Sequence, residues 1–547
     1  MNRTRKLLKK VIAVAAASSL IAAGGSTVMA AGSYQEAETA AYDKFVSGVA
    51  SSWEEYLASY QTAQKGSNAK ITLNVEDTGR ALLGAMAGGM DFSWLQSISL
   101  DTNTSLQQGL EALTAAVLLN DSKLCDLNIY MDFAKMAEYI QIPDISEGYL
   151  VAPMESSDVN ISDDSMKLYF NLLSDLSSVL PDKDTLSTLL ERYGQLVISN
   201  MEDGASTDET VSVEGISEDC TVYEGQLSEA SAVKMLEDIA KTAKDDKEIK
   251  SLFDSWTEAG IATDDQYQEF QTAVDDLLSD FADEGADDST LIYSRIWVNN
   301  EDKVVGREIG TVDGAETTPV FTWKAPSADG SSALLLEVQA DGSSLTLTGS
   351  GTSSEGLLTG DYIFAMDGTE TMDIHVADLE TKPEKTGYYN GKFTLTFPAI
   401  DTESTGSEDT TTNPLAGLAV EVNLTSDITT ETSQIDLTLT TSGAALATLS
   451  ISGGYGEGPE TKDGDSLTPA YSVDDENDAV EYMKTINWDT LAANATAAGV
   501  PEELVSQLQT LLDSAVQNVI NPDTAEADTT EETTENTEAI EDTDAAA

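Results

Sequence analysis

Residues 334–348 have the sequence LLLEVQADGSSLTLT, in which two short apolar–polar alternations flank Asp341-Gly342. A period of two places every second side chain on the same face of a β-strand. Asp-Gly between two alternating runs is among the strongest short-range signals of a β-hairpin. This stretch therefore predicts two antiparallel strands with one apolar face and one polar face.

The same pattern extends from Thr290 to Gly453. Asp367-Gly368 joins a second alternating pair, and Thr, Ser, Asp and Glu fill most of the positions between apolar residues. Later runs include Phe393-Leu395-Phe397, Val420-Val422-Leu424, Ile435-Leu437-Leu439 and Leu449-Ile451. We expect a large antiparallel sheet here, with one wet face and one buried face.

Further strands are expected near the N-terminus. Ile71, Leu73 and Val75 alternate with polar residues, and similar runs follow near 95–103, 111–119, 123–133 and 137–142. Turn-forming residues such as Asn120-Asp121-Ser122 separate them. This arrangement predicts an antiparallel meander.

Helices are predicted where apolar residues recur at helical spacing. These segments are 31–65, the leucine repeat at 168, 172, 176 and 180, three helices near 228–242, 246–258 and 264–283 after a hairpin at 211–223, and 476–520. The predicted fold class is thus α+β. We expect a large curved, half-barrel-like antiparallel sheet, either continuous or made of two halves, that is covered by amphipathic helices.

The two ends of the chain differ from the rest. Residues 1–30 combine basic residues, an apolar stretch and small residues before Ala30 and Ala31, which predicts a cleaved bacterial secretory signal peptide. Residues 521–547 hold ten acidic and no basic residues, which predicts a disordered acidic tail. Between them we expect an N-terminal α+β domain at 31–310, an antiparallel β region at 311–460 that either continues the same sheet or forms its second half, and a C-terminal helical segment at 461–520.

The composition excludes some functions. The chain has 97 Asp and Glu against 28 Lys and Arg, a formal net charge of −69. Binding of nucleic acids or of anionic lipid surfaces needs clustered basic residues, so we expect neither. No segment reaches about 18 consecutive apolar residues, so we expect no transmembrane helix. The localisation expected is extracellular or in the cell-envelope space.

The only two cysteines, Cys125 and Cys220, leave two alternatives open. In an exported chain they could form one disulfide. They could equally be two buried free thiols, because the sequence does not show whether they lie close together.

Three short motifs suggest chemistry, but each has a simpler interpretation. Ser231-Ala232-Val233-Lys234 and Lys385-Thr386-Gly387 match elements of penicillin-binding enzymes, yet the S-D-N element between them is missing. Gly454-Tyr455-Gly456-Glu457-Gly458 precedes Pro459 rather than a helix, so we interpret it as a strand-exit loop. His375, the only histidine, alternates onto the polar face of a strand. No catalytic residue is predicted.

No cofactor or specific metal site is predicted either. Asp158 to Asp163 lacks the glycine and glutamate of a calcium loop, and the acidic clusters at 283–288 and 474–478 have no coordination pattern. We expect at most diffuse calcium binding by an acidic, solvated surface.

Residues 66–310 resemble the lipoprotein-carrier fold of the LolA and LppX families. The resemblance lies in the strand Ala69–Glu76, in the hairpins Val117–Tyr149 with Ile142-Pro143-Asp144-Ile145, and in the return to strand at Ser289–Glu308. It implies a curved half-barrel that holds apolar ligands, commonly lipids, between its concave face and covering helices. It implies no particular binding residue.

Three functions follow as expectations. The first is a non-catalytic secreted or envelope-associated protein that binds an apolar, lipid-like ligand between sheet and helices. The second is a surface or matrix interaction protein, with a cell-envelope protein as partner and a purely structural sheet. The third, a hydrolase, would need a cleft with converging carboxylates.

Overall fold

The computed structural model describes residues 31–107, 109–154, 179–282, 287–340, 342–383, 385, 387–398 and 416–520. The predicted signal peptide, the acidic tail, the Asp158–Asp163 segment and the leucines at 168, 172 and 176 lie outside these residues. So do parts of the acidic cluster at 283–288, together with Asp341 and Thr386.

The strands of the described residues belong to one 21-stranded sheet. The N-terminal ones are β1 (Ser67–Val75), β2 (Ser97–Gln107), β3 (Leu110–Leu119), β4 (Ser122–Asp132), β5 (Ala137–Gln141) and β6 (Tyr149–Pro153). The middle ones are β7 (Glu202–Val213), β8 (Ile216–Ser228), β9 (Thr290–Asn299), β10 (Val304–Asp313), β11 (Glu316–Lys324), β12 (Ser327–Ala328), β13 (Ser331–Ala340) and β14 (Ser343–Ser354). The last are β15 (Leu357–Met366), β16 (Thr369–Glu380), β17 (Gly391–Thr396), β18 (Leu418–Asp427), β19 (Thr432–Thr441), β20 (Ala444–Tyr455) and β21 (Ala470–Ser472).

Nearly all neighbours in the sheet are also neighbours in the sequence. An antiparallel series runs from β7 to β11, through β13, to β20. A second runs from β1 to β6, and short β21 adds to β6 in parallel. The two series join where β1 pairs with β20, for example Lys70 with Ser452. The sheet is therefore one continuous layer rather than two halves, and strands before and after residue 310 belong to it together.

The hairpin prediction at Asp367-Gly368 is confirmed. Both residues have positive φ, 50° and 73°, as a type I′ turn requires, and β15 and β16 pair on either side of it. The strands of the opening stretch, β13 and β14, also pair as expected, for example Leu336 with Leu347.

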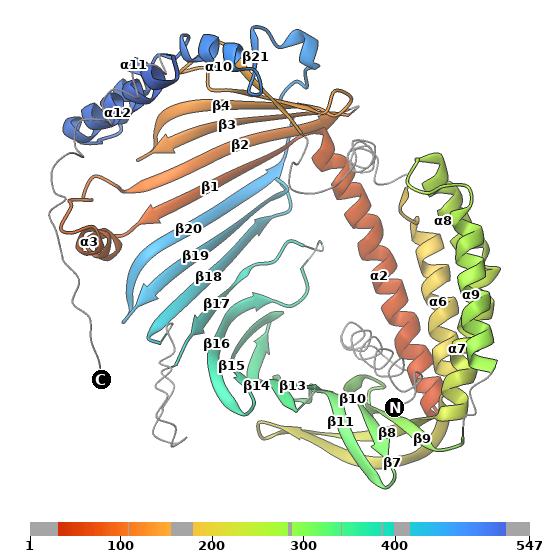
Figure 1. The fold of residues 1–547 in the computed structure, drawn as a ribbon. Coiled ribbons are helices and arrows are strands. Elements are labelled where there is room, and N and C mark those ends of the chain that lie inside the picture. The colour runs from red at the N-terminus through yellow and green to blue at the C-terminus, as the bar shows by residue number, and fades with distance from the viewer. Residues whose placement is uncertain are drawn as a thin grey trace, which may run out of the picture.

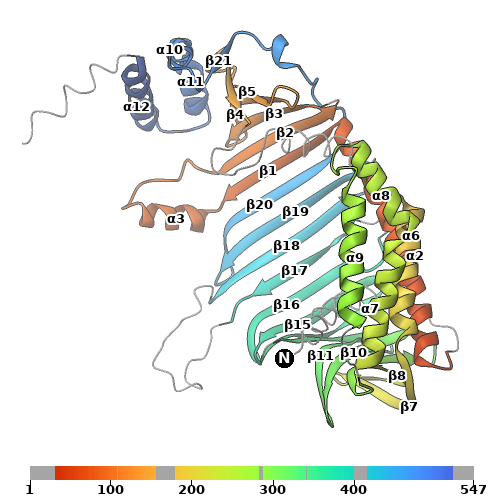
Figure 2. The ribbon, with the colours of Figure 1, turned by 45° about the vertical axis from the view of Figure 1, so that its right-hand side comes forward.

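The helices gather mainly beside the sheet. They are α2 (Tyr34–Lys65), α3 (Asp77–Met86), α6 (Lys183–Ser199), α7 (Glu229–Lys244), α8 (Lys247–Glu258), α9 (Gln266–Ala282), α10 (Glu476–Met483), α11 (Asp489–Ala497) and α12 (Glu502–Ile520). Figure 1 shows the sheet bent, with α2 on its concave side and running from β8 and β9 towards β1 and β2. Figure 2 shows α6, α7, α8 and α9 on this side too, and α10 to α12 near β4.

Local sequence explains where several helices begin. Ser33 accepts a hydrogen bond from Glu36 N at the start of α2, and Asp182 accepts one from Thr185 N at the start of α6. The predicted helix at 31–65 is thus confirmed. The predicted helical region 476–520 is confirmed and consists of three helices, α10, α11 and α12.

The main hydrophobic core lies at the β8–β13 end of the sheet. It joins side chains of α2, α7 and the strands: Tyr34, Ala37, Ala41, Met201, Leu227, Ala232, Met235, Ile292, Ile296, Val298, Val304, Ile309, Phe321 and Trp323. The prediction of an α+β fold with a large antiparallel sheet is confirmed, and the sheet is open rather than a closed barrel.

Candidate functional site: an apolar sheet face

Two rows of apolar side chains cross the middle of the sheet. The register aligns Val376, Phe393, Val422, Leu437, Leu449, Leu73, Ile98 and Leu119 in the first row. The second row holds Leu424, Ile435, Ile451, Ile71, Leu100, Val117 and Cys125. Because directly opposite residues share a face, both rows lie on one side of the sheet, which we call the apolar face.

The apolar face is the side of the sheet that faces α2. Leu334, Leu336 and Val338 of β13 pack against the core that contains Tyr34 and Ala41 of α2. Leu336 lies opposite Leu347, Leu347 opposite Phe364, and Phe364 opposite Met372, so these side chains share one face. Met372 lies on the same side of β16 as Val376, which belongs to the first row.

Away from that core, the apolar face is only partly buried. Ile98 is 45% exposed, Ile435 40% and Leu73 38%, and Ile71 and Ile451 are similar. Large contiguous apolar surfaces of this kind are uncommon on soluble proteins and mark sites of interaction. The central apolar face is therefore the strongest candidate for a binding surface among the described residues.

A buried ion pair fixes α2 to one end of this face. Arg307 of β10 donates through Nη1 to both carboxylate oxygens of Glu38, at 2.6 and 2.7 Å. The Arg307 side chain is 3% exposed, and its Nε and Nη2 have no hydrogen-bond partner among the described residues. Burial first, and the Glu38 carboxylate second, raise the pKa of the neighbouring Tyr34 hydroxyl.

Helix α2 is also held by α6 and by the residues just before α6. The Tyr42 hydroxyl donates to Leu190 O at 3.1 Å, and Trp53 Nε1 donates to Pro181 O at 2.8 Å. Gly194 of α6 permits this approach, because a Cβ there would lie 2.1 Å from the Tyr42 ring. The helix passes beside the concave side of the sheet, and its buried residues all lie between Tyr34 and Ala50.

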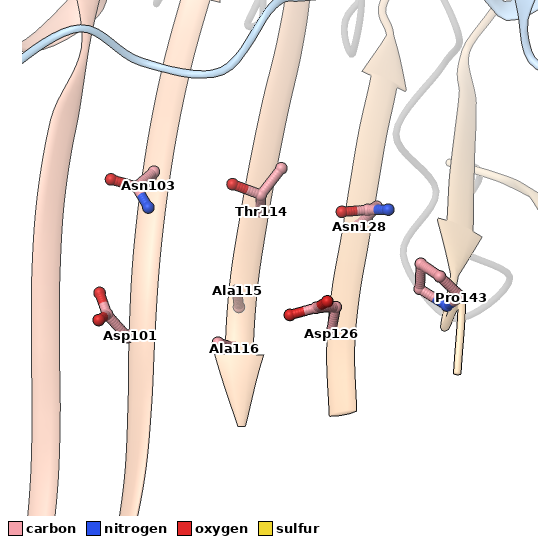
Figure 3. A pocket seen from close by; sticks show the side chains of 8 residues that line it. All are labelled: Asp101, Asn103, Thr114, Ala115, Ala116, Asp126, Asn128 and Pro143. Carbon is pink, nitrogen blue, oxygen red and sulfur yellow. The ribbon is translucent and has the colours of Figure 1, made fainter. Parts of the chain in front are cut away.

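Behind the two apolar rows, the opposite face of the sheet is mostly polar, although small apolar clusters cover it near β8 and near β4. Figure 3 shows a shallow cavity there, between β2, β3 and β4. It has a volume of about 290 Å³, and its lining residues are Asp101, Asn103, Thr114, Ala115, Ala116, Asp126, Asn128 and Pro143. Asp126 is paired with Lys123 at 2.6 Å. Polar and acidic lining suits water or a hydrated ligand rather than a hydrocarbon.

His375 lies on the polar face, as predicted. Its Nδ1 is 2.7 Å from Asp361 Oδ1, and the side chain is half exposed. The alternating neighbours Ile374 and Val376 point to the apolar face, so the histidine is not part of the candidate site.

The enzyme-like motifs have structural partners. Ser231 donates to Glu202 at 2.8 Å in the first turn of α7, and Lys234 contacts Asp238 and Asn200. Lys385, in the connection between β16 and β17, pairs with Glu431 at 2.8 Å. The serine and this second lysine therefore belong to different regions, each with its own acidic neighbour.

The glycines at 454–458 form the exit from β20, as predicted. Gly456 N donates to Gly66 O at 3.1 Å. Gly458 also lies against Gly66, and a Cβ on Gly458 would lie 2.5 Å from Thr104 O. These glycines allow the backbone segments to pack together where α2 leads into β1.

Both cysteines are free thiols in the structure, Cys220 buried and Cys125 half-buried. Cys220 lies on β8 and Cys125 on β4, strands separated in the sheet by β9 to β20 and β1 to β3. This separation is the reason that the disulfide alternative is not formed here. Burial, followed by the Glu218 carboxylate, raises the pKa of Cys220 to about 12.

Two acidic residues of the cluster at 474–478 serve local structure. Asp475 caps α10 by accepting from Asn477 N at 2.8 Å, and Asp478 accepts from Ser472 N at 2.9 Å. Within the described ranges, no group of three or more His, Cys, Asp or Glu side chains is placed to hold a metal ion.

Two features near the apolar face are not predicted by the sequence pattern. One is the Glu38–Arg307 pair, whose partners lie far apart in the sequence. The other is α3, a short helix with exposed Leu82 and Met86.

No helix in the described part of the chain is long and apolar enough to cross a membrane. No family model matches the chain, and no curated protein or solved structure matches it either.

Proposed function

We propose that this protein is a non-catalytic, exported or envelope-associated protein that binds an apolar, lipid-like ligand on the apolar face. The observation that carries the proposal is the pair of apolar rows, in which Ile71, Leu73, Ile98, Ile435 and Ile451 at the centre of the sheet are 38–45% exposed. In this proposal α2 and its neighbouring helices cover the ligand on the concave side, as in the lipoprotein-carrier fold that the sequence resembles.

The dimensions of the face favour a chain-like ligand. The first row crosses eight strands, and neighbouring strands lie about 4.8 Å apart, so the row extends for roughly 34 Å along the sheet. Within this central area the rows contain only apolar side chains and the half-buried Cys125. A hydrocarbon chain can lie along such a strip without leaving polar groups unsatisfied.

Two neighbouring residues of β20 provide a matched test. Ile451 lies on the apolar face, and Ser452 lies on the polar face beside Lys70. Ile451→Glu places a charge in the ligand site, whereas Ser452→Glu adds the same charge where a cation is nearby. We expect Ile451→Glu to weaken binding of a fluorescent fatty acid at least about tenfold and Ser452→Glu to leave it unchanged.

The purified protein should also release lipid on solvent extraction, detected by mass spectrometry. If the protein neither carries lipid nor binds the fatty acid, the sheet is structural and the proposal is wrong. Equal loss of binding in both variants would place the ligand elsewhere.

A further inference from the structure

Residues 77–94 form an exposed apolar projection between β1 and β2. Within them, 81–90 have the sequence ALLGAMAGGM and carry no charge. All of these ten residues except Gly84 are exposed, with Met86 at 78%, Met90 at 51% and Leu82 at 49%. We call 81–90 the rim segment. Figures 1 and 2 both show α3 standing off the ends of the strands, away from α2.

The contacts that attach the rim segment to the sheet leave its large apolar side chains exposed. Its attachment uses the start of α3: Glu76 N donates to Leu446 O at 3.0 Å, and Arg80 donates to Val75 O and Asp77. At Gly79 a Cβ would lie 2.1 Å from Leu446 O, so glycine permits the close packing on β20. The anchoring contacts therefore involve backbone and small residues, and the leucines and methionines are left to point outward.

The rim segment is continuous with the apolar face. Leu73 of the first row is two residues from Val75, where β1 ends and leads into α3. Ile98 of the same row is the second residue of β2, and β2 begins shortly after the rim segment. An exposed apolar segment thus lies at the strand ends that border the proposed ligand site.

The net negative charge of the chain indicates which partner the rim segment can bind. A second copy of the chain would bring two surfaces together that each belong to a molecule of formal charge −69. Anionic lipids and nucleic acids are disfavoured by the same repulsion. An uncharged or zwitterionic lipid surface accepts leucine and methionine side chains without this cost.

We propose that the rim segment docks the protein on a zwitterionic lipid surface, with Leu82, Leu83, Met86 and Met90 entering the interface. The inference rests on the proposed function for the choice of lipid as partner, because the apolar face would exchange its ligand with the surface on which α3 docks.

Flotation of the purified protein with phosphatidylcholine vesicles tests the inference. We expect the wild-type protein to float with the vesicles and Leu82→Ser/Met86→Ser to lower its partition at least about tenfold. The matched control is Leu508→Ser/Leu511→Ser on α12, where the leucines are 56% and 66% exposed but lie among Glu502, Glu503 and Asp513. This control should float like the wild type.

Fatty-acid binding without vesicles separates the two proposals and reports on folding. The α3 variant should bind the fluorescent fatty acid like the wild type, because its changes lie outside the apolar face. A wild-type protein that binds fatty acid but does not float overturns the docking inference alone. Flotation that is unchanged in the α3 variant, or lost in the α12 control instead, also overturns it. Flotation without fatty-acid binding leaves docking intact and contradicts the proposed function.

Discussion

Glu38 of α2 and Arg307 of β10 form an ion pair that joins the helix to the sheet. The pair is buried, with Glu38 14% and Arg307 3% exposed. Removing one partner of a buried pair leaves an uncompensated charge, which typically costs 3–5 kcal/mol. We expect Glu38→Gln to lower the free energy of unfolding by about this amount, measured by urea denaturation.

A second glutamate on the same helix provides the control. Glu54 pairs with Lys183 at 2.7 Å, but both side chains are exposed. Glu54→Gln should therefore cost less than about 1 kcal/mol. Replacing both Glu38 and Arg307 by Met should restore most of the loss, because no buried charge remains. An equal effect of Glu38→Gln and Glu54→Gln would show that the buried pair does not fix α2.

The buried thiol of Cys220 gives a pH-dependent prediction. Its pKa is raised from 9.0 to about 12 in the folded protein, mainly by burial. Below pH 9 the thiol is protonated in both states, so this contribution to stability is complete. As the pH rises from 9 towards 12, only the unfolded thiol loses its proton, and stability falls by about 1.4 kcal/mol per pH unit.

Cys220→Ala should remove this part of the alkaline slope. The free energy of unfolding in urea is measured at pH 8, 9 and 10. The quantity compared across pH is the difference in this free energy between variant and wild type. Burial also raises the pKa of the half-buried Cys125 thiol, so Cys125→Ala is the comparison and should remove a smaller part of the slope. A variant-to-wild-type difference that does not change with pH would contradict the prediction.

At the scale of elements, the buried residues of α2 are confined to its N-terminal part, residues 34–50. Ala37 and Ala41 are completely buried, and Ala58 in the second half is exposed. Ala41→Leu should lower the free energy of unfolding by about 1–3 kcal/mol, because the added methylenes have no space in a packed core. Ala58→Leu should change it by less than about 0.5 kcal/mol. Thermal or urea unfolding measures both, and equal effects would mean that the helix is held along its whole length.

Strong periodicity made most elements predictable from the sequence. The helix at 34–65, the hairpin at Asp367-Gly368 and the meander from β2 to β5 follow from apolar spacing and turn residues. Helix α3 does not, because its ten residues include Gly79 and Gly84 and its position depends on Leu446, far away in the sequence. A short glycine-containing helix has little helix-forming tendency of its own.

At the scale of the whole molecule, alternation predicts strands but not their distant neighbours. It also predicts an apolar face without showing how much of that face is covered. Ile98 and Ile435 match the pattern of core residues, yet both are exposed by 40% or more. The candidate site arises from this difference between pattern and burial, so only the structure could locate it.

The pairing of β1 with β20 is the whole-molecule feature that sequence pattern could not give, and it can be tested directly. Lys70 lies opposite Ser452, and Ser452 lies opposite Gln434 on β19. Directly opposite residues have Cβ atoms about 4.5–5.5 Å apart, close enough for a disulfide after small adjustments, while residues two strands apart are roughly twice as far. In a Cys125→Ala/Cys220→Ala background, Lys70→Cys/Ser452→Cys should therefore cross-link on oxidation.

The readout is a mobility shift on a non-reducing gel, since a disulfide between positions 70 and 452 closes most of the chain into one loop. Lys70→Cys/Asp101→Cys is the positive control, because Lys70 also lies opposite Asp101 on β2. Lys70→Cys/Gln434→Cys is the negative control, since β20 separates its two positions. The cross-link should also stabilise the protein by about 2–4 kcal/mol, because it constrains the unfolded chain. Cross-linking of 70 to 434 but not to 452 would mean that β1 joins a different strand, and both apolar rows would then lose their continuity across the sheet.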